Sequence, residues 1–324
     1  GSGSGSNAGT SNGNGTPWML KDIYSGFSGS SLNFLTAVGN TLYFSAHDGI
    51  NGHELWKSDG TASGTVMVKD INSGSGNGLP TYLAAVGNTL YFRASDGTNG
   101  LELWKSDGTA SGTVMVKDIR SGSGASNPSH LTVIGNTFYF SASDGTNGNE
   151  LWKSDGTASG TVMVKDIRSG SSSSSLDYLT AVGNTLYFRA SDGTNGAELW
   201  KSDGTASGTV MVKDIRSGSF SGNPLYLTAI GNTLYFRASD GTNGNELWKS
   251  DGTVSGTVMV KDIRSGSSGS SPGHLTVVGN TLYFSAHDGT NGVELWKSDG
   301  TASGTVMVKN INSGSDSSSL DYLT

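Results

Sequence analysis

Six tryptophans recur at a constant spacing of 48 residues, and this period is the feature that most limits how the chain can fold. They are Trp56, Trp104, Trp152, Trp200, Trp248 and Trp296. Each stands in the same phrase, Glu-Leu-Trp-Lys-Ser-Asp-Gly-Thr. A fixed period of this length is typical of a repeat architecture, in which each repeat buries its apolar surface against its neighbours. We therefore expect the repeats to form one domain rather than two unrelated ones.

Each period is predicted to contain four short β-strands. In the period that begins near Leu83, residues 82–86, 90–94, 101–105 and 113–119 are rich in β-branched and aromatic residues, and turns rich in Gly, Asn and Asp separate them. Continuous apolar runs such as Leu90-Tyr91-Phe92 indicate strands that are buried on both faces, and no helical period is present.

Four-stranded repeats of this length are typical of β-propeller blades, because each blade lies between two neighbours that cover both of its faces. A β-solenoid is the structural rival, but its coils are usually shorter and its strands alternate more strictly. The sequence therefore predicts an all-β fold, a β-propeller with four-stranded blades of 48 residues.

The two ends of the repeat array bear on the number of blades. Residues 18–23 align with 66–71, and residues 320–324 align with 32–36, so the chain has six copies of the first three strands and seven of the fourth. We predict six blades, with the N-terminal strand closing the ring by completing the last blade, since closure hides a sheet edge. The surplus segment 306–324 then has three options: it displaces the equivalent N-terminal segment, it remains unpaired, or it pairs with another chain. The alternatives are seven blades or a strand-swapped assembly.

The repeated phrase resembles a known family signature. Residues 102–109, Glu-Leu-Trp-Lys-Ser-Asp-Gly-Thr, match the motif of bacterial β-propellers built from ELWxxDGT repeats, and the resemblance covers residues 17–324. Its Ser-Asp-Gly-Thr turn also resembles the Asp box of sialidase-type propellers, which joins the third and fourth strands of a blade. Gly112-Thr113 stands where that box has an aromatic residue, so the resemblance implies no sialidase activity.

Composition narrows the remaining choices. Residues 1–16 are rich in Gly, Ser and Asn and are interpreted as a flexible linker or tag, which leaves 17–324 as a single propeller domain. The chain has no cysteine, which excludes disulfides and thiolate metal sites. Its net charge of −7 argues against a nucleic-acid or anionic-membrane partner, and no apolar run is long enough to predict a membrane span.

The copies differ mainly at one end of the predicted blade. In a propeller, the hairpins between strands 2 and 3 and the connections from strand 4 to the next strand 1 lie on one face, which we call the variable face. The connections are the most varied segments of the period, namely residues 73–81, 121–129, 169–177, 217–225, 265–273 and 313–321. Loops on a rigid scaffold often bind ligands, so this face is the candidate binding surface.

Arginine, histidine and tyrosine gather on the same face. The predicted ligand-binding residues are Arg93, Arg120, Arg168, Arg189, Arg216, Arg237, Arg264, His53, His130 and His274. His47 and His287 lie beside the hairpins. The alternative interpretation is that these loops tolerate change, with the arginines paired to nearby acids such as Asp96 or Asp118.

Catalytic and metal chemistry are not predicted. The oxygens of residues 96–102 could serve as Ca²⁺ ligands, but the spacing is not that of an EF-hand or an RTX coil, and Asp and Asn commonly stabilise turns. Glu102 is expected to pair with Arg93 or a lysine instead. The same carboxylates occur in every period, and the tryptophans are expected to pack in the core. We therefore expect no enzyme activity, no metal and no cofactor.

Three hypotheses on function follow. The first is a non-enzymatic propeller scaffold, from a secreted or surface-exposed bacterial protein, that presents the variable face to an acidic glycan or a protein partner. The second is a structural repeat protein that forms homo-oligomers through its surplus terminal strand. The third is an engineered or excised propeller with no ligand, which the Gly-Ser opening and the abrupt end at Thr324 favour.

Overall fold

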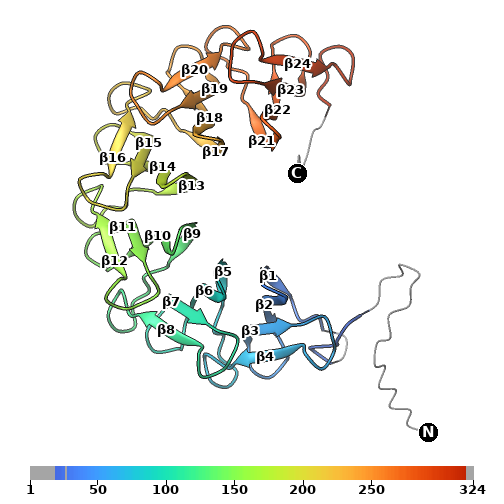
Figure 1. Ribbon diagram of the computed structural model, residues 1–324, viewed down its shortest axis with the longest axis vertical. Helices are drawn as coiled ribbons and strands as arrows, with labels where there is room; N and C mark the ends of the chain where they lie inside the picture. Colours follow the sequence, from blue (N-terminus) through green and yellow to red (C-terminus); the bar gives the residue numbers. More distant parts are fainter. Residues whose placement is uncertain (1–18, 26–27, 319–324) are drawn as a thin grey trace. The chain divides into compact units, whose positions relative to one another are not determined.

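The computed structural model describes residues 19–25 and 28–318, and these form six four-stranded sheets. Figure 1 labels the strands, which follow one another in chain order across each sheet. No helix occurs in the described part of the chain, and so none there could span a membrane. The all-β fold with six four-stranded sheets, predicted from the period, is confirmed.

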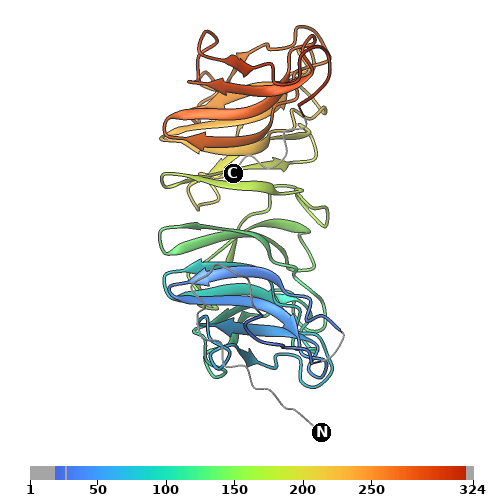
Figure 2. The ribbon, with the colours of Figure 1, turned by 90° about the vertical axis from the view of Figure 1, so that its right-hand side faces the viewer.

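The chain divides into two compact units, and the division passes through the third sheet. The first unit comprises residues 1–131, 142–145 and 154–161, and the second comprises residues 132–141, 146–153 and 162–324. Within the second unit the sheets lie in successive layers (Figure 2).

Two whole sheets belong to the first unit, and the third sheet is shared between the units. The strands of the first sheet are β1 (Asn33–Val38), β2 (Thr41–His47), β3 (His53–Ser58) and β4 (Val66–Lys69). Those of the second are β5 (Thr81–Val86), β6 (Thr89–Ala94), β7 (Glu102–Ser106) and β8 (Val114–Lys117). Those of the third are β9 (Ser129–Ile134), β10 (Thr137–Ser143), β11 (Asn149–Ser154) and β12 (Val162–Lys165).

The remaining three sheets belong to the second unit. The fourth sheet has β13 (Asp177–Val182), β14 (Thr185–Ser191), β15 (Ala197–Ser202) and β16 (Val210–Lys213). The fifth has β17 (Leu225–Ile230), β18 (Thr233–Ser239), β19 (Asn245–Ser250) and β20 (Val258–Lys261). The sixth has β21 (Gly273–Val278), β22 (Thr281–His287), β23 (Val293–Ser298) and β24 (Val306–Lys309).

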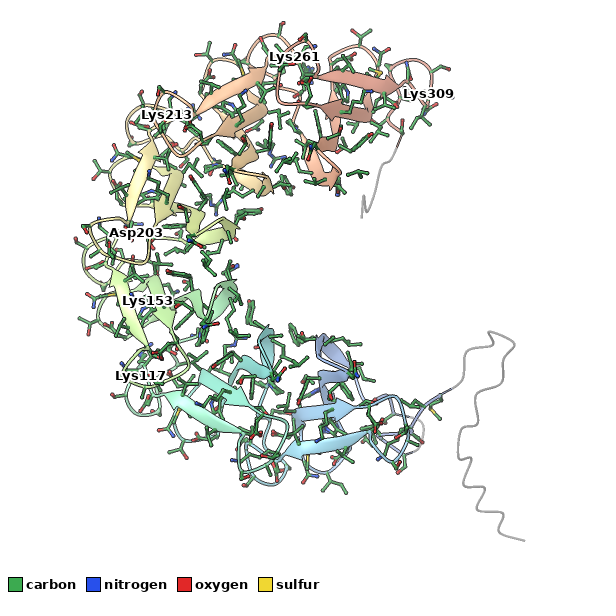
Figure 3. The ribbon with its side chains drawn as sticks, viewed as in Figure 1. Lys117, Lys153, Asp203, Lys213, Lys261 and Lys309 are labelled. Carbon is green, nitrogen blue, oxygen red and sulfur yellow. The ribbon has the colours of Figure 1, made fainter. Side chains whose placement is uncertain are left out.

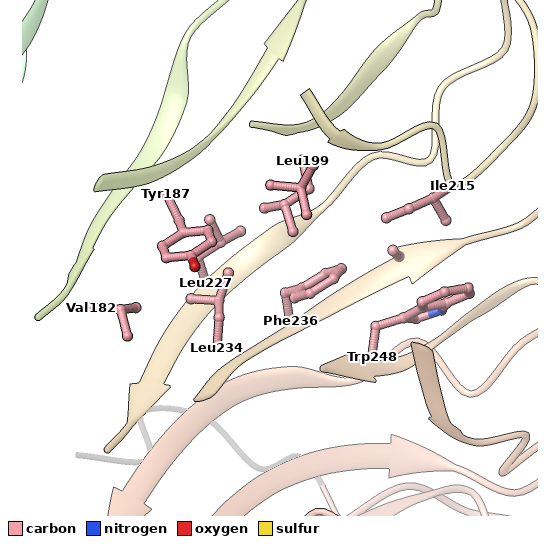
Figure 4. Close-up of a cluster of buried hydrophobic side chains, with 10 residues drawn as sticks. Val182, Tyr187, Leu199, Ile215, Leu227, Leu234, Phe236 and Trp248 are labelled. Atoms are coloured by element: carbon pink, nitrogen blue, oxygen red, sulfur yellow. The ribbon is translucent and has the colours of Figure 1, made fainter. Parts of the chain in front are cut away.

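Apolar side chains from facing sheets form the core between them. In the second unit, Tyr187 and Leu199 of the fourth sheet meet Leu234, Phe236 and Trp248 of the fifth (Figure 4). The corresponding residues of the other sheets form similar clusters within each unit. The tryptophans thus pack in the core, as predicted. Burial on both sides explains the unbroken apolar runs of the second strands, because each run faces two neighbouring sheets.

Lysines join neighbouring sheets at the turns between strands 3 and 4. In the second unit, Lys201 Nζ donates to the carbonyl oxygen of Gly252 at 2.9 Å, and Lys213 Nζ donates to that of Thr257 at 2.8 Å. Figure 3 shows Lys213 and Lys261 on the fourth strands. The same pattern recurs in the first unit from Lys57 to Gly108. The sequence of these turns is therefore uniform because each turn accepts hydrogen bonds from the lysines of the preceding sheet.

The ends of the repeat array differ from its middle. Lys21 Nζ donates to Thr65 O at 2.6 Å, as a fourth-strand lysine does to the next sheet, and Ile23 packs beside the core of the first sheet. Residues 19–23 form no strand. In the sixth sheet the fourth position is filled by β24, which pairs with β23. That the N-terminal segment completes the last blade in place of β24 stays a prediction. Trp18 and residues 320–324, on which this prediction also rests, lie outside the described residues.

Candidate functional site

A buried glutamate holds the variable face together in each period. Glu102 is fully buried, and its carboxylate accepts hydrogen bonds from the backbone amides of Ile119 and Ser126, each at 2.9 Å, and from the Ser126 hydroxyl at 2.6 Å. The glutamate at the start of strand 3 therefore fixes both ends of the connection that follows strand 4. This confirms that the hairpins and the connections lie together within each unit.

The same clamp explains two differences from the sequence interpretation. The fourth strand ends at Lys117, although residues 113–119 were expected to be extended, because the Ile119 amide turns to the glutamate instead of to the sheet. Glu102 also forms no pair with Arg93 or a lysine, since backbone and hydroxyl donors occupy it. Burial raises the pKa of Glu54, Glu150 and Glu198 to about 7 against the lowering effect of their amide donors.

The predicted arginines divide into two groups with different surroundings. Those that follow strand 4 are Arg120, Arg168, Arg216 and Arg264. They pack over a hairpin glycine of the following repeat: a Cβ atom on Gly241 would lie 2.8 Å from Arg216 Nε, and one on Gly193 would lie 3.1 Å from Arg168 Nε. Arg216 also lies over the Phe220 ring, with 4.8 Å from Cζ to the centroid. This group therefore covers the hairpins and joins neighbouring repeats.

The arginines of strand 2 each lie over a tyrosine of strand 1. The Cζ atoms of Arg93, Arg189 and Arg237 are 4.8, 5.8 and 4.9 Å from the ring centroids of Tyr82, Tyr178 and Tyr226, respectively. A guanidinium over an aromatic face is favourable. The expected pairing with Asp96 or Asp118 is not found, because Asp96 accepts from Thr98 and Asn99 of its own turn and Asp118 from the Gly122 amide.

These tyrosines belong to a set that we call the ring positions, one in the first strand of each sheet. The set is Phe34, Tyr82, His130, Tyr178, Tyr226 and His274. All six have φ between 53° and 58°, a left-handed conformation that is unfavourable for bulky residues. In the first unit the Tyr82 centroid lies 6.5 Å from that of Phe34 and 6.2 Å from that of His130; in the second, the Tyr178 and Tyr226 centroids lie 6.0 Å apart.

A β-bulge produces this conformation. In the fifth sheet, Leu225 pairs with Arg237 and Thr228 pairs with Tyr235, so two residues of β17 stand opposite one residue of β18. Bulges re-aim a side chain and are common beside functional sites. Here the bulge turns the Tyr226 ring toward Arg237 and leaves it 38% exposed. The same register shift occurs in β1, β5, β13 and β21.

The predicted histidines also fall into two groups. His130 and His274 are ring positions. His53 lies apart from them, beside His47 at 5.3 Å between centroids, and burial and that neighbour lower the pKa of His53. Sequence reasoning placed tyrosine on this face but named neither the individual tyrosines nor Phe34 as ligand-binding residues. A signal was present, because every copy has a ring residue at this position.

Metal ligands do not converge among the described residues, where no group of three His, Asp or Glu side chains is close enough to hold an ion. The Asp96 carboxylate, considered for Ca²⁺, accepts from the Thr98 amide at 2.9 Å, the Asn99 amide at 2.8 Å and Asn99 Nδ2 at 2.7 Å. Its oxygens therefore stabilise the hairpin, and the absence of a metal stays a prediction.

Comparisons with known proteins bear on the fold. No protein-family model matches the chain, and no curated protein is similar to it. Oligopeptidase B from Leishmania major is similar in structure over 85% of this chain and 41% of its own, with 13% identity and a TM-score of 0.50. The puromycin hydrolase S511A mutant complexed with PGG shares 14% identity over 85% of this chain and 45% of its own, with a TM-score of 0.49.

The computationally designed Ika8 protein shares 17% identity over 89% of this chain and 77% of its own, with a TM-score of 0.48. This chain spans less than half the length of the oligopeptidase and of the puromycin hydrolase. The likeness to the oligopeptidase concerns the fold alone. The chain has the fold of a β-propeller with six four-stranded blades, as predicted, and its membership of the ELWxxDGT family stays a prediction.

Proposed function

We propose that the chain is a non-enzymatic β-propeller scaffold whose variable face binds a glycan or a protein partner through the ring positions. The observation behind this proposal is the repeated left-handed backbone of these large residues. Each such residue costs about 1–2 kcal/mol relative to a right-handed or extended one, whereas Gly and Asn tolerate the conformation. A fold built for stability alone would place Gly or Asn there.

The surroundings of the ring positions also support binding. Tyr82 and Tyr226 are 39% and 38% exposed, although large aromatic residues are usually buried. Strain and exposure of this kind are typical of ligand-binding positions. The carboxylates that recur in every period are occupied by the clamp or by their own turns, which supports a scaffold rather than an enzyme. An extracellular or cell-surface location suits such a scaffold and is part of the proposal.

The test is a binding screen of the full chain beside a variant that lacks the tyrosine rings. The variant combines Tyr82→Asn, Tyr178→Asn and Tyr226→Asn. Affinity electrophoresis in neutral and acidic polysaccharides and a displayed peptide library supply the two ligand classes. We expect the full chain to bind a member of one class and the variant to lose it. Equal binding by both proteins would overturn the role of the ring positions.

A second candidate function is self-assembly, which the outer face of the sixth sheet favours. Val308 and Ile311 are 45% and 54% exposed, whereas their counterparts in the fifth sheet, Val260 and Ile263, are 7% and 9% exposed beneath the next sheet. An exposed apolar sheet face invites a partner chain. Light scattering over a range of concentrations tests this, with Ile311→Lys expected to lower the mass of any oligomer.

A matched control for that measurement is Val254→Lys. Val254 is 64% exposed in a turn between strands 3 and 4 and lies on no unpartnered sheet face. Its substitution should leave the oligomer intact. A monomer at all concentrations would overturn the second candidate and leave the first untouched.

A further inference from the structure

Two adjacent sheets of the second unit each carry a tyrosine and an arginine side by side. Tyr178 of β13 lies beneath Arg189 of β14, and Tyr226 of β17 lies beneath Arg237 of β18. The two tyrosine rings are 6.0 Å apart, with an interplanar angle of 64°. A hydrogen bond joins the first strands of these two sheets: Thr180 Oγ1 of β13 donates to the carbonyl oxygen of Leu227 of β17 at 3.3 Å. We call these four residues the tyrosine–arginine quartet.

Tyrosine and arginine occur together throughout the chain. Wherever the ring position is tyrosine, the strand-2 position that pairs near it is arginine, as in Tyr82 with Arg93. Where the ring position is Phe34, His130 or His274, the same strand-2 position holds Ser45, Ser141 or Ser285. The two residues therefore form one unit. A guanidinium gains from a tyrosine face but would repel a protonated histidine.

The guanidinium charges of the quartet are only partly balanced inside the fold. Arg189 Nη2 lies 3.6 Å from Asp177 Oδ2, a partly exposed ion pair. Arg237 stands opposite Leu225 instead, and no acidic side chain among the described residues lies within ion-pair distance of it. Its buried Nε, like that of Arg189, has no hydrogen-bond partner in the part of the chain that the structure describes, so the missing acidic neighbour is what distinguishes Arg237. Arg237 is therefore the member of the quartet best placed to attract an anion.

Both charges also converge on one ring. Burial and the neighbouring Asp177 and Tyr226 raise the pKa of the Tyr178 hydroxyl, while Arg189 and Arg237 both act to lower it. Because Arg189 lies over Tyr178 and Arg237 lies over Tyr226, and the two ring centroids are 6.0 Å apart, the two guanidinium groups lie over neighbouring rings. A ligand lying across the tyrosine rings would meet two positive charges in succession.

We propose that the quartet binds two consecutive units of a linear acidic polysaccharide, with an anionic group of the sugar chain at each arginine. This inference rests on the proposed function and names its ligand. Two like subsites in series suit a ligand that itself repeats, whereas a folded protein partner offers no such period. Tyrosine supplies an apolar face for the sugar ring, and arginine binds carboxylate or sulfate through paired hydrogen bonds.

The experiment measures binding of the full chain to four acidic polysaccharides: polygalacturonate, alginate, hyaluronate and chondroitin sulfate. Methyl-esterified polygalacturonate is the uncharged counterpart, and poly-L-glutamate is an anion without sugar rings. The test variant is Arg237→Gln, which keeps a polar side chain of similar length. The matched control is Lys297→Gln, because Lys297 is an exposed lysine near the turn between strands 3 and 4 of the sixth sheet, away from the variable face.

We expect the full chain to bind at least one acidic polysaccharide, with weaker binding at high salt. Arg237→Gln should weaken it by about tenfold or more, as loss of a hydrogen bond to a charged group implies. Lys297→Gln, which also removes one positive charge, should leave it within about twofold, a change of under 0.5 kcal/mol. Tyr226→Asn should weaken binding as well, which a purely electrostatic contact would not show.

Three results would overturn the inference. They are the absence of binding to all four acidic polysaccharides, equal binding to poly-L-glutamate, and an equal loss of binding in Lys297→Gln and Arg237→Gln. If the chain then binds a neutral glycan or a displayed peptide through the ring positions, the proposed function stands and only the acidic ligand is wrong. If the chain binds none of these ligands, both fail.

Discussion

Removing a tyrosine ring from a left-handed position should cost far less stability than removing one from the core. Tyr226 has φ of 58° and is 38% exposed, whereas Tyr235 of the same sheet is 7% exposed in an ordinary strand. The perturbation is Tyr226→Asn compared with Tyr235→Asn. Asparagine tolerates the left-handed region, so only the first substitution relieves strain.

The expected change in the free energy of unfolding for Tyr226→Asn follows from three contributions. Fully burying a large apolar side chain stabilises by about 1.5–3 kcal/mol, so a ring about three-fifths covered, like that of Tyr226, contributes about 1–2 kcal/mol. Strain relief of about 1–2 kcal/mol offsets this loss. What remains is the stacking with Arg237, about 0.5–1 kcal/mol. Tyr235→Asn has no such offset and should cost about 3–5 kcal/mol, because it leaves a cavity.

Urea denaturation followed by tryptophan fluorescence measures the difference, since a buried tryptophan lies in every sheet. We expect the midpoint of Tyr226→Asn to lie close to that of the unmodified chain and the midpoint of Tyr235→Asn to be clearly lower. Equal losses would refute the reasoning, because the ring position would then be a core position. The strain argument for ligand binding would fail with it.

Two further predictions concern the residues that hold the sheets. The pKa of Glu54, Glu150 and Glu198 is raised to about 7 from 4.5 by burial, so the folded state binds more protons between these values; the unfolding free energy should fall as pH rises from about 5 to about 8. Denaturation at the two pH values checks this, and a rise would contradict it. Lys201→Met removes the bond to Gly252 but keeps an apolar stem, and should cost about 1.5–3 kcal/mol. Lys297→Met, at an exposed lysine of the sixth sheet, should change stability by under about 0.5 kcal/mol. An equal loss of stability in Lys201→Met and Lys297→Met would refute the role of the hydrogen bond from Lys201 to Gly252.

Much of the fold could be predicted because its causes are local and repeated. The period set the number of sheets, and apolar runs such as Leu90-Tyr91-Phe92 showed burial on both faces. The fourth strand was predicted too long, since nothing in its own residues shows that the Ile119 amide binds Glu102, seventeen positions earlier. A hydrogen bond between a backbone amide and a side chain that is distant in sequence cannot be inferred from the pattern of apolar residues in a strand.

The candidate site was only partly predictable. Variability and charge located the face and both groups of arginines, but not that Arg216 covers a hairpin while Arg237 faces a tyrosine. Among the ring positions, the histidines were named as ligand-binding residues, but the tyrosines and Phe34 were not, for a physical reason. A positive φ is normally inferred from Gly or Asn, and a tyrosine such as Tyr226 gives no such indication. Only the register of the bulge shows it.

The positions that are identical in every repeat and the positions that vary have separate physical causes. The invariant glutamate, tryptophan and lysine each bind or pack against a part of the next strand, turn or sheet, so a change there would disturb the repeat contacts. The ring positions contact the strand-2 arginines and neighbouring rings, and they vary only among Phe, Tyr and His and never adopt the residue that their backbone favours. Tolerance alone would have admitted Gly, Asn or Ser at one of the six. A position that varies among three residue types but always retains a ring, against its own backbone preference, is explained most simply by a ligand outside the fold.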